Sequence, residues 1–306
     1  MDVEQRGAGL RLPRSRAGSS PQHLLATVLG EYLDSADAGL PSTAVIAILA
    51  QFGISESSAR AALSRLVGRG LIVARGGGRA PVYHLTAEAL AGHHAHMRRF
   101  FEFGSRPPRW TGDWVMATFS IPGPAKGCRH QVRRTLTGLR MVGLYDSVWI
   151  RPGSVVQPVR EALDAVLRDV AGARWSVLTA RFDDEAGPHG PAAAYDLPGL
   201  AAAYRDFVER YADLRVAAGE SRVDPARALV ARTSLMDAWR RFPDLDPDLP
   251  GHLLPQPWPR RDARQTFLEI HTALGSLAQA RLIEVATAHW PDAGRWITHF
   301  QAPPDA

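Results

Sequence analysis

Arginines crowd one stretch near the start of the chain. Between positions 54 and 84, five arginines face a single acidic residue, Glu56. The five are Arg60, Arg65, Arg69, Arg75 and Arg79. Such an imbalance is the electrostatic signature of a surface that meets phosphate, and arginine can also donate two parallel hydrogen bonds to guanine. The chemistry indicated here is recognition of a nucleic acid.

The charge distribution along the rest of the chain agrees with this interpretation. The 306 residues include 36 basic and 31 acidic side chains, which gives a net charge of +5. Up to Trp110 there are 13 arginines and 8 acidic residues, whereas the remainder has 23 residues of each sign. All of the excess positive charge therefore lies in the first third of the chain. Lys126 is the one lysine, so arginine abundance is also a property of the composition as a whole.

Three predicted helices position these arginines. The first covers residues 20–33 and the second covers 42–52, each with apolar residues at helical spacing. Gly53 suits the left-handed end of the second helix, and a third helix begins after the capping residue Ser55. Two helices joined by so short a turn form a helix–turn–helix.

The third helix, which is predicted to run to Arg69, has two distinct faces. Its core face is predicted to hold Ala59, Ala62, Leu63, Leu66 and Val67. Its outward face carries small and basic residues, namely Ser57, Arg60, Ala61, Ser64, Arg65 and Gly68. Small side chains let a helix settle deep in a major groove. We expect Arg60 and Arg65 to contact bases or phosphates and the two serines to contact phosphate, with Ala61 on the same face.

A β-hairpin is predicted to follow the three helices. The β-prone residues 71–74 and 80–85 flank a glycine-rich run at 75–79. This hairpin completes a winged helix, and its tip is expected to bring Arg75 and Arg79 to the DNA backbone or the minor groove. The glycine run is not a P-loop, because no Lys-Ser or Lys-Thr pair follows it.

Two further groups of residues could do chemistry. His93, His94 and His96 lie on a predicted helix at 86–103, and the spacing of the first and last suits a metal ion. No carboxylate or cysteine accompanies them, so a solvated linker or dimer helix is the preferred interpretation. Cys128 is the single cysteine, which excludes an internal disulfide and a cysteine-rich zinc site.

The overall organisation is predicted to be α+β. A Gly- and Pro-rich stretch at 104–109 is followed by the order strand, helix, strand, strand, helix, strand, which is the ferredoxin-like arrangement. Beyond a linker at 187–191, three apolar stripes at helical spacing indicate an all-helical domain. The predicted parts are a disordered basic arm (1–19), a winged-helix DNA-binding domain (20–86), a linker helix (87–109), a ferredoxin-like dimerisation or effector domain (110–186) and a helical C-terminal domain (192–292).

Short motifs run through all three domains. In the first they are Phe52-Gly53-Ile54, Glu56, Arg60, Ala62 to Leu66, Gly70 and Tyr83-x-Leu85-Thr86. Later motifs are Trp110-x-Gly112-x-Trp114, Val148-Trp149-Ile150-x-Pro152, Arg240-Arg241-Phe242-Pro243-x-Leu245-Asp246-Pro247-x-Leu249-Pro250, Leu254-Pro255 and Trp258. Together they resemble the PaaX family of bacterial transcriptional repressors, whose middle domain is similar to Cas2. The resemblance implies a homodimer on a two-fold DNA operator, released when a small-molecule effector binds.

The resemblance also implies an effector of a particular class. The type member of the family responds to phenylacetyl-CoA, so a related aromatic CoA thioester and a role in phenylacetate catabolism are expected. Phosphates of such a ligand would need cations, and those available on the first helix of the middle domain are Arg129, Arg133, Arg134 and Arg140. An acyl pocket could be lined by Trp149, Trp239 and Trp258. The simpler interpretations are a solvated helix face and core residues.

Two other classes of function are open, a metal-dependent nuclease and an enzyme acting on a small molecule. A Cas2-type nuclease needs an Asp at the end of its first strand to hold a metal ion. The residues at this position are Phe119, Ser120 and Ile121, and Asp113 stands at the opposite end. No local motif supplies convergent acid and base groups either. We therefore expect no enzyme, no metal site and no cofactor.

Membrane insertion and export are not indicated. No stretch approaches ~18 consecutive apolar residues, the length that marks a spanning helix. The arginines near the start of the chain are not followed by the apolar core of a signal peptide. We therefore expect a cytoplasmic protein.

Overall fold

The computed structural model describes residues 20–76, 81–108, 110–123 and 126–301. The predicted disordered arm at 1–19 lies outside the described residues. The chain forms two compact units, and each is built from segments that are distant in the sequence. The first unit contains Met1–Ser105, Phe207–Arg241 and Asp262–Ala306, and the second contains Arg106–Asp206 and Phe242–Arg261.

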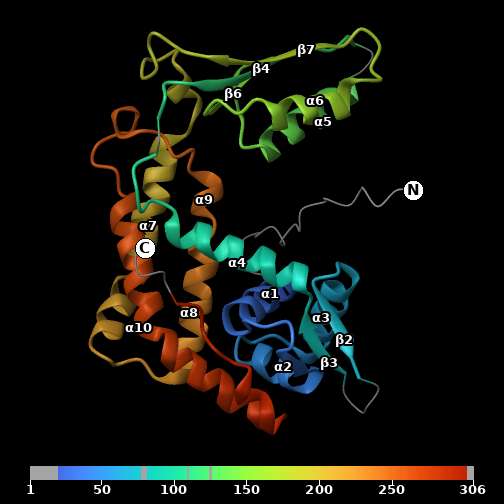
Figure 1. The fold of residues 1–306 in the computed structure, drawn as a ribbon. Coiled ribbons are helices and arrows are strands. Elements are labelled where there is room, and N and C mark those ends of the chain that lie inside the picture. Colours follow the sequence, from blue (N-terminus) through green and yellow to red (C-terminus); the bar gives the residue numbers. More distant parts are fainter. Residues whose placement is uncertain (1–19, 77–80, 109, 124–125, 302–306) are drawn as a thin grey trace. The chain divides into compact units, whose positions relative to one another are not determined.

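The described start of the first unit is a winged helix. Its elements are α1 (Pro21–Tyr32), β1 (Gly39–Pro41), α2 (Ser42–Ala50), α3 (Glu56–Gly68), β2 (Ile72–Arg75) and β3 (Val82–Leu85). The strands form an antiparallel sheet in the order β1–β3–β2, and Figure 1 shows the β2–β3 hairpin beside α3. The three helices and the hairpin confirm the prediction. Strand β1 is an addition that the sequence pattern does not indicate.

Two glycines and one serine set the turns around α3. Gly53 has a φ of +73° and Gly70 a φ of +69°, in the left-handed region that glycine adopts without a steric penalty. The hydroxyl of Ser55 accepts a hydrogen bond from the backbone N–H of Ser58 at 3.3 Å, which caps the helix start. Helix α3 then packs against α1, so the orientation of α3 depends on that of α1.

Helix α4 (Ala87–Glu102) also packs against α1. Gly30 of α1 leaves the space that the His93 ring fills, because a Cβ at Gly30 would lie 2.1 Å from His93 Cε1. Met97, Phe100 and Phe101 are buried in the later turns of α4. The prediction of a solvated helix is therefore wrong for this face, which belongs to the core of the first unit.

The remainder of the first unit is helical. It contains α8 (Pro225–Trp239), most of α10 (Arg260–Thr287) and the second half of α7 (Leu197–Gly219). The Trp239 ring stacks on Phe267 with centroids 4.9 Å apart, and Phe101 of α4 lies 5.3 Å from the same Phe267 ring. The helical prediction for this region is confirmed. Within the described ranges, no helix combines the length and the apolar character that crossing a membrane requires.

The second unit contains a four-stranded antiparallel sheet. Its elements are β4 (Trp114–Ser120), α5 (Lys126–Gly138), β5 (Val142–Tyr145), β6 (Val148–Pro152), α6 (Gln157–Leu167) and β7 (Arg174–Ala180). The strands lie in the order β5–β6–β4–β7, and Figure 1 shows α5 and α6 together on one face. This order of elements confirms the ferredoxin-like prediction.

Alternate residues of β4 enter two separate cores. Val115 and Ala117 pack against α5 and α6, whereas Trp114 and Met116 face the opposite side of the sheet. That opposite side is covered by 3-10 helix η2 (Pro191–Ala194) and by apolar residues from later in the chain. These covering residues are Leu197, Leu249, Leu253, Leu254 and Trp258. Strand β4, in the interior of the sheet, is thus covered on both faces, whereas Ser176 and Leu178 of the edge strand β7 are exposed.

The proline-punctuated segment that follows α9 (Phe242–Leu245) is anchored by Asp246, which is fully buried. The Asp246 carboxylate accepts hydrogen bonds from the Tyr204 hydroxyl and from the backbone N–H of Asp248, both at 2.7 Å. It also lies 3.5 Å from Arg260 Nη1. Burial and then the Asp246 carboxylate raise the pKa of Tyr204, so this hydroxyl stays protonated and donates. The segment is therefore fixed as a cover of the sheet.

Candidate nucleic-acid interface

Helix α3 presents the predicted face to solvent. The exposed residues include Ser57, Arg60, Ala61, Ser64, Arg65 and Gly68, and the buried ones are Ala59, Ala62, Leu63 and Leu66. The placement of Val67 in the core is wrong, because its side chain is 40% exposed. Helix α3 ends one residue later, and Leu71, which is 4% exposed, is the next apolar residue to enter the core. The amphipathic pattern of α3 is otherwise confirmed.

The two arginines of this face have different surroundings. Arg60 donates from Nε and Nη2 to one carboxylate oxygen of Glu56, at 2.9 and 2.7 Å. Both side chains are more than half exposed, so the ion pair can open at little cost. Arg65, in contrast, makes no side-chain hydrogen bond or ion pair with any residue that the structure describes. One arginine is thus held by its neighbour, and the other is ready for a partner.

The serines lie at opposite ends of the face. Ser57 is in the first turn of α3, where its hydroxyl lies 3.2 Å from that of Ser55. Ser64 is exposed two turns later, next to Arg65. Both hydroxyls can turn toward phosphate oxygens without breaking a contact of the core. Their contact with DNA stays a prediction.

The wing carries one predicted arginine within the described residues. Arg75 is exposed at the end of β2, opposite Val82 of β3. Gly76 follows with a φ of +85°, which turns the chain into the tip. Arg79 lies outside the described residues. The pairing of β2 with β3 thus fixes the backbone position of Arg75 at the end of β2.

Three of the predicted effector cations lie on the part of α5 that is exposed to solvent. Arg129, Arg133 and Arg134 are exposed, while Val132 and Leu136 are buried against the sheet. Helix α5 contains no acidic residue, and the Arg129 guanidinium donates to the backbone carbonyl of Ile121 at 2.7 Å. Exposed arginines suit phosphates, and their role in binding an effector stays a prediction.

The fourth predicted cation is placed differently. Arg140 is not on the first helix of the middle domain, as predicted, because α5 ends at Gly138. It lies in the following turn with a φ of +62°, and its guanidinium donates to the backbone carbonyl of Asp246. Arg140 therefore ties the turn after α5 to the segment that covers the sheet.

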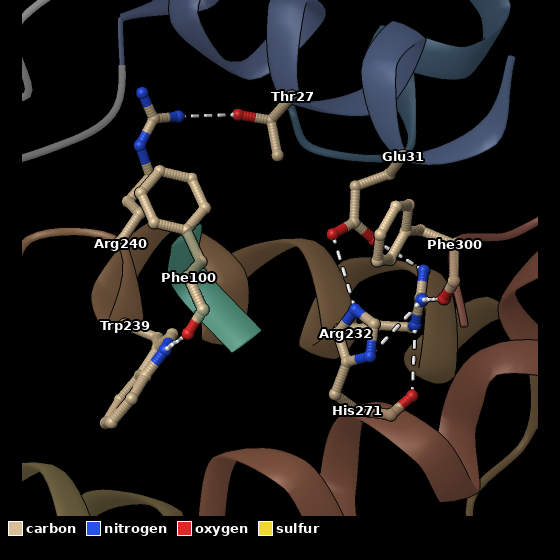
Figure 2. A network of polar contacts seen from close by, with 8 residues as sticks. All are labelled: Thr27, Glu31, Phe100, Arg232, Trp239, Arg240, His271 and Phe300. Atoms are coloured by element: carbon tan, nitrogen blue, oxygen red, sulfur yellow. Dashed lines mark hydrogen bonds and ion pairs between the residues drawn. The ribbon is translucent and has the colours of Figure 1, made fainter. Parts of the chain in front are cut away.

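The three tryptophans proposed for an acyl pocket lie in three different cores. Trp149 packs with the residues between the sheet and α5 and α6, and Trp258 packs on the opposite side of that sheet. Trp239 is fully buried in the first unit, where its indole N–H donates to the carbonyl of Phe100 at 2.9 Å (Figure 2). The structure does not bring these three rings together.

The residues weighed for metal or catalytic chemistry are also separate. Among the described residues, no group of three His, Cys, Asp or Glu side chains could hold a metal ion. The rings of His93 and His94 are 6.4 Å apart, and His96 Nδ1 lies 2.6 Å from the carbonyl of Gly92. Asp113 precedes β4 and accepts a hydrogen bond from Arg181 at 2.7 Å. This ion pair lowers the pKa of Asp113.

A buried polar network lies where α1, α8 and α10 meet, and the sequence pattern does not indicate it (Figure 2). Glu31 and Arg232 have side chains that are 0% exposed, with Oε2 and Nη1 2.5 Å apart. Arg232 also donates to the backbone carbonyls of His271 at 3.1 Å and Phe300 at 2.8 Å. His271 Nε2 lies 3.3 Å from the second oxygen of Glu31.

The protonation states in this network follow from its charges. Burial raises the pKa of Glu31, but Arg232 and then His271 lower it by more, so it falls to about 2 and the carboxylate is ionised. Burial and then Arg232 lower the pKa of His271 to about 4, so its ring is neutral at neutral pH. A neutral ring that donates from Nε2 to Glu31 leaves Nδ1 to accept from Arg232, 3.4 Å away.

Comparison with known proteins adds three family matches. A model described as PaaX-like protein matches residues 20–89, the PaaX protein central Cas2-like domain matches 107–189, and the PaaX-like protein C-terminal domain matches 195–283. Among solved structures, Uncharacterized protein Rv0674 from Mycobacterium tuberculosis is similar, with 26% sequence identity and a TM-score of 0.53. That match covers 86% of this chain and 98% of the other. No curated protein matches the chain.

Proposed function

Because the chain belongs to the PaaX family, we propose that it is a transcriptional repressor that binds operator DNA through α3 and the wing. The observation that carries this proposal is the outward face of α3, where two arginines and two serines stand around Ala61. A face of this size and charge fits a major groove, in which arginine reads guanine and serine reaches phosphate. Arg75 at the base of the wing adds a contact to the backbone.

The proposal includes a homodimer on a two-fold operator. A symmetric protein presents two copies of α3, and the half-sites of its operator are ~34 Å apart, one turn of DNA, or a multiple of this. Repression would end when an effector favours a dimer in which the two helices no longer match that spacing. The effector proposed is an aromatic acyl-CoA such as phenylacetyl-CoA, whose phosphates would meet Arg129, Arg133 and Arg134 of α5.

Genomic DNA capture with the purified protein tests this function. The wild type, Arg60→Ala and Arg65→Ala are compared for the fragments that they enrich. We expect the wild type to enrich a short palindrome, and each variant to lose it or to accept other bases at one position of each half-site. Candidate CoA thioesters are then added to the complex, and release of DNA identifies the effector.

Two results would overturn the proposal. If the wild type and both variants recover the same unspecific fragments, α3 does not read sequence. If labelled DNA is cleaved when magnesium is added, the protein is a nuclease and not a repressor. A further control is Arg261→Ala, which removes an exposed arginine of α10 outside the winged helix and is expected to leave the enriched palindrome unchanged.

A further inference from the structure

Helix α1 carries a stripe of polar residues on a face that is buried. His23, Thr27 and Glu31 follow one another at intervals of four residues, so they lie on one side of the helix. All three side chains are buried, with exposed fractions of 1%, 5% and 1%. A polar stripe on a helix normally faces solvent, so this stripe must have partners inside the first unit.

Each member of the stripe meets a residue of α8 or the residue after it. His23 Nε2 lies 2.7 Å from a carboxylate oxygen of Asp237. The Thr27 hydroxyl accepts a hydrogen bond from Arg240 at 3.0 Å, as Figure 2 shows. Glu31 forms the ion pair with Arg232. Three polar contacts in line therefore fix the position of α1 along α8.

The end of the chain holds α1 from another side. The backbone N–H of Thr298 donates to the carbonyl of Tyr32, and that of Phe300 donates to the carbonyl of Glu31, both at 3.0 Å. The Phe300 carbonyl in turn accepts from Arg232. The last turn of α1 is thus clamped between α8, α10 and the segment 297–300, which forms a β-bridge from Ile297 to the residue after Tyr32.

Stability alone does not explain a fully buried ion pair. The free energy needed to remove two charges from water often exceeds the free energy gained from their attraction. Apolar residues of similar volume frequently give equal or greater stability. What charged groups add is a defined geometry, because Glu31 contacts Arg232 with one carboxylate oxygen and His271 with the other, and a shift of α1 would lengthen both contacts. The best-attested use of such buried groups is to fix one register among several.

The position of α1 also determines where the outward face of α3 lies. Helix α1 packs against α3, so a shift of α1 along α8 carries the outward face of α3 with it. We propose that Glu31, Arg232 and His271 are positioning residues for DNA recognition. Through them, α8, α10 and the segment 297–300 help to orient the helix α3 that binds DNA. A ligand that moves α8 or α10 would then change operator affinity through this network. The inference rests on the proposed function, which supplies the DNA.

An apolar exchange separates positioning from stability. The double variant Glu31→Leu with Arg232→Met replaces the buried charges by side chains of similar length. Its matched control is Arg215→Met with Glu269→Leu, which removes an ion pair of 2.5 Å between α7 and α10 that is partly exposed. Thermal unfolding and affinity for the captured operator are measured on the full chain for both. We expect the first variant to unfold within a few degrees of wild type but to bind the operator at least tenfold more weakly, and the control to change neither.

A milder variant covers the case in which the double variant does not fold. His271→Gln keeps a donor near Glu31 while altering its geometry, and amide hydrogen exchange is compared with wild type. We expect faster exchange in α1 and α3, although the substitution is on α10. The proposal is overturned if a folded double variant binds the operator like wild type, or if faster exchange in His271→Gln is confined to α8 and α10. A wild type that enriches no DNA refutes the proposed function instead, and the exchange measurement still tests the coupling.

Discussion

Replacing Glu56 by Gln is expected to tighten binding to the operator while making the fold slightly less stable. In the free protein the carboxylate holds the guanidinium of Arg60 at 2.7 and 2.9 Å. A base or phosphate must draw Arg60 away from this partner. The substitution removes the competing carboxylate, and it also removes a negative charge from the surface that we propose to contact phosphates.

The size of the effect follows from the exposure of the pair. Glu56 and Arg60 are 63% and 59% exposed and lie four residues apart on α3, and such pairs contribute about 0.3–0.5 kcal/mol. Releasing Arg60 from this pair should therefore raise operator affinity about twofold, since about 1.4 kcal/mol corresponds to tenfold. The free energy of unfolding should fall by the same pair energy plus about 0.3–1 kcal/mol, because Glu56 stands in the first turn of α3, where an acidic residue favours the helix dipole.

Fluorescence anisotropy with the captured operator at several salt concentrations measures the affinity, and thermal unfolding measures the stability. The matched control is Glu88→Gln, which removes an exposed acid from the first turn of α4 and should lower stability without changing affinity. The slope of log affinity against log salt should steepen by up to about 0.9 for Glu56→Gln. Weaker binding, or equal gains for both variants, would refute the role given to Arg60.

Three further predictions concern the wing, the buried histidines and the segment that covers the sheet. Arg75→Ala should weaken binding to all DNA sequences alike and reduce the salt slope by about 0.9; a change at one base position would contradict a backbone contact. The pKa values of His93 and His271 are lowered to about 4 in the fold. The free energy of unfolding should therefore keep its full value above pH 6.5 and fall by about 1.4 kcal/mol per pH unit for each histidine as pH drops toward 4. Denaturant titrations of wild type and His271→Gln should differ in this slope, and equal slopes would contradict the lowered pKa of His271. Tyr204→Phe should cost about 1–3 kcal/mol, because the buried Asp246 carboxylate loses its hydroxyl donor at 2.7 Å and keeps the backbone N–H of Asp248 and the longer contact with Arg260. Chemical denaturation measures this loss, and an unchanged midpoint would refute the anchoring role.

Much of the fold could be predicted because its elements are amphipathic or bounded by strong turn residues. Apolar residues recur along α3 often enough to identify both of its faces. The sequence therefore predicts correctly which arginines and serines of this helix are exposed. Val67 breaks the pattern because periodicity does not say where a helix leaves the core. Strand β1 has three residues, too few to show alternation. Arg140 continues the helical spacing of α5, but its positive φ takes it out of the helix.

The network around Glu31 could not be predicted from the sequence. The polar stripe of α1 looks like a solvated face, because spacing within a helix does not identify the partner. Arg232 and His271 lie more than two hundred residues away, and no local pattern connects them to α1. The contacts of the aromatic residues of α4 could not be predicted either, because Phe101 and Phe267 are distant in the sequence and meet only in the folded chain. Contacts of this kind depend on tertiary structure.

The way the chain passes between the two units limits how this protein can be divided. The polypeptide changes unit after residues 105, 206, 241 and 261, and the second and fourth of these changes fall inside α7 and α10. No single cut, and no exchange of one continuous gene segment, separates the two units. A chimaera that combined the first unit of this chain with the second unit of a relative would need four junctions, two of them within continuous helices. New specificities in such a protein are therefore expected to arise by point substitution more readily than by recombination of its parts.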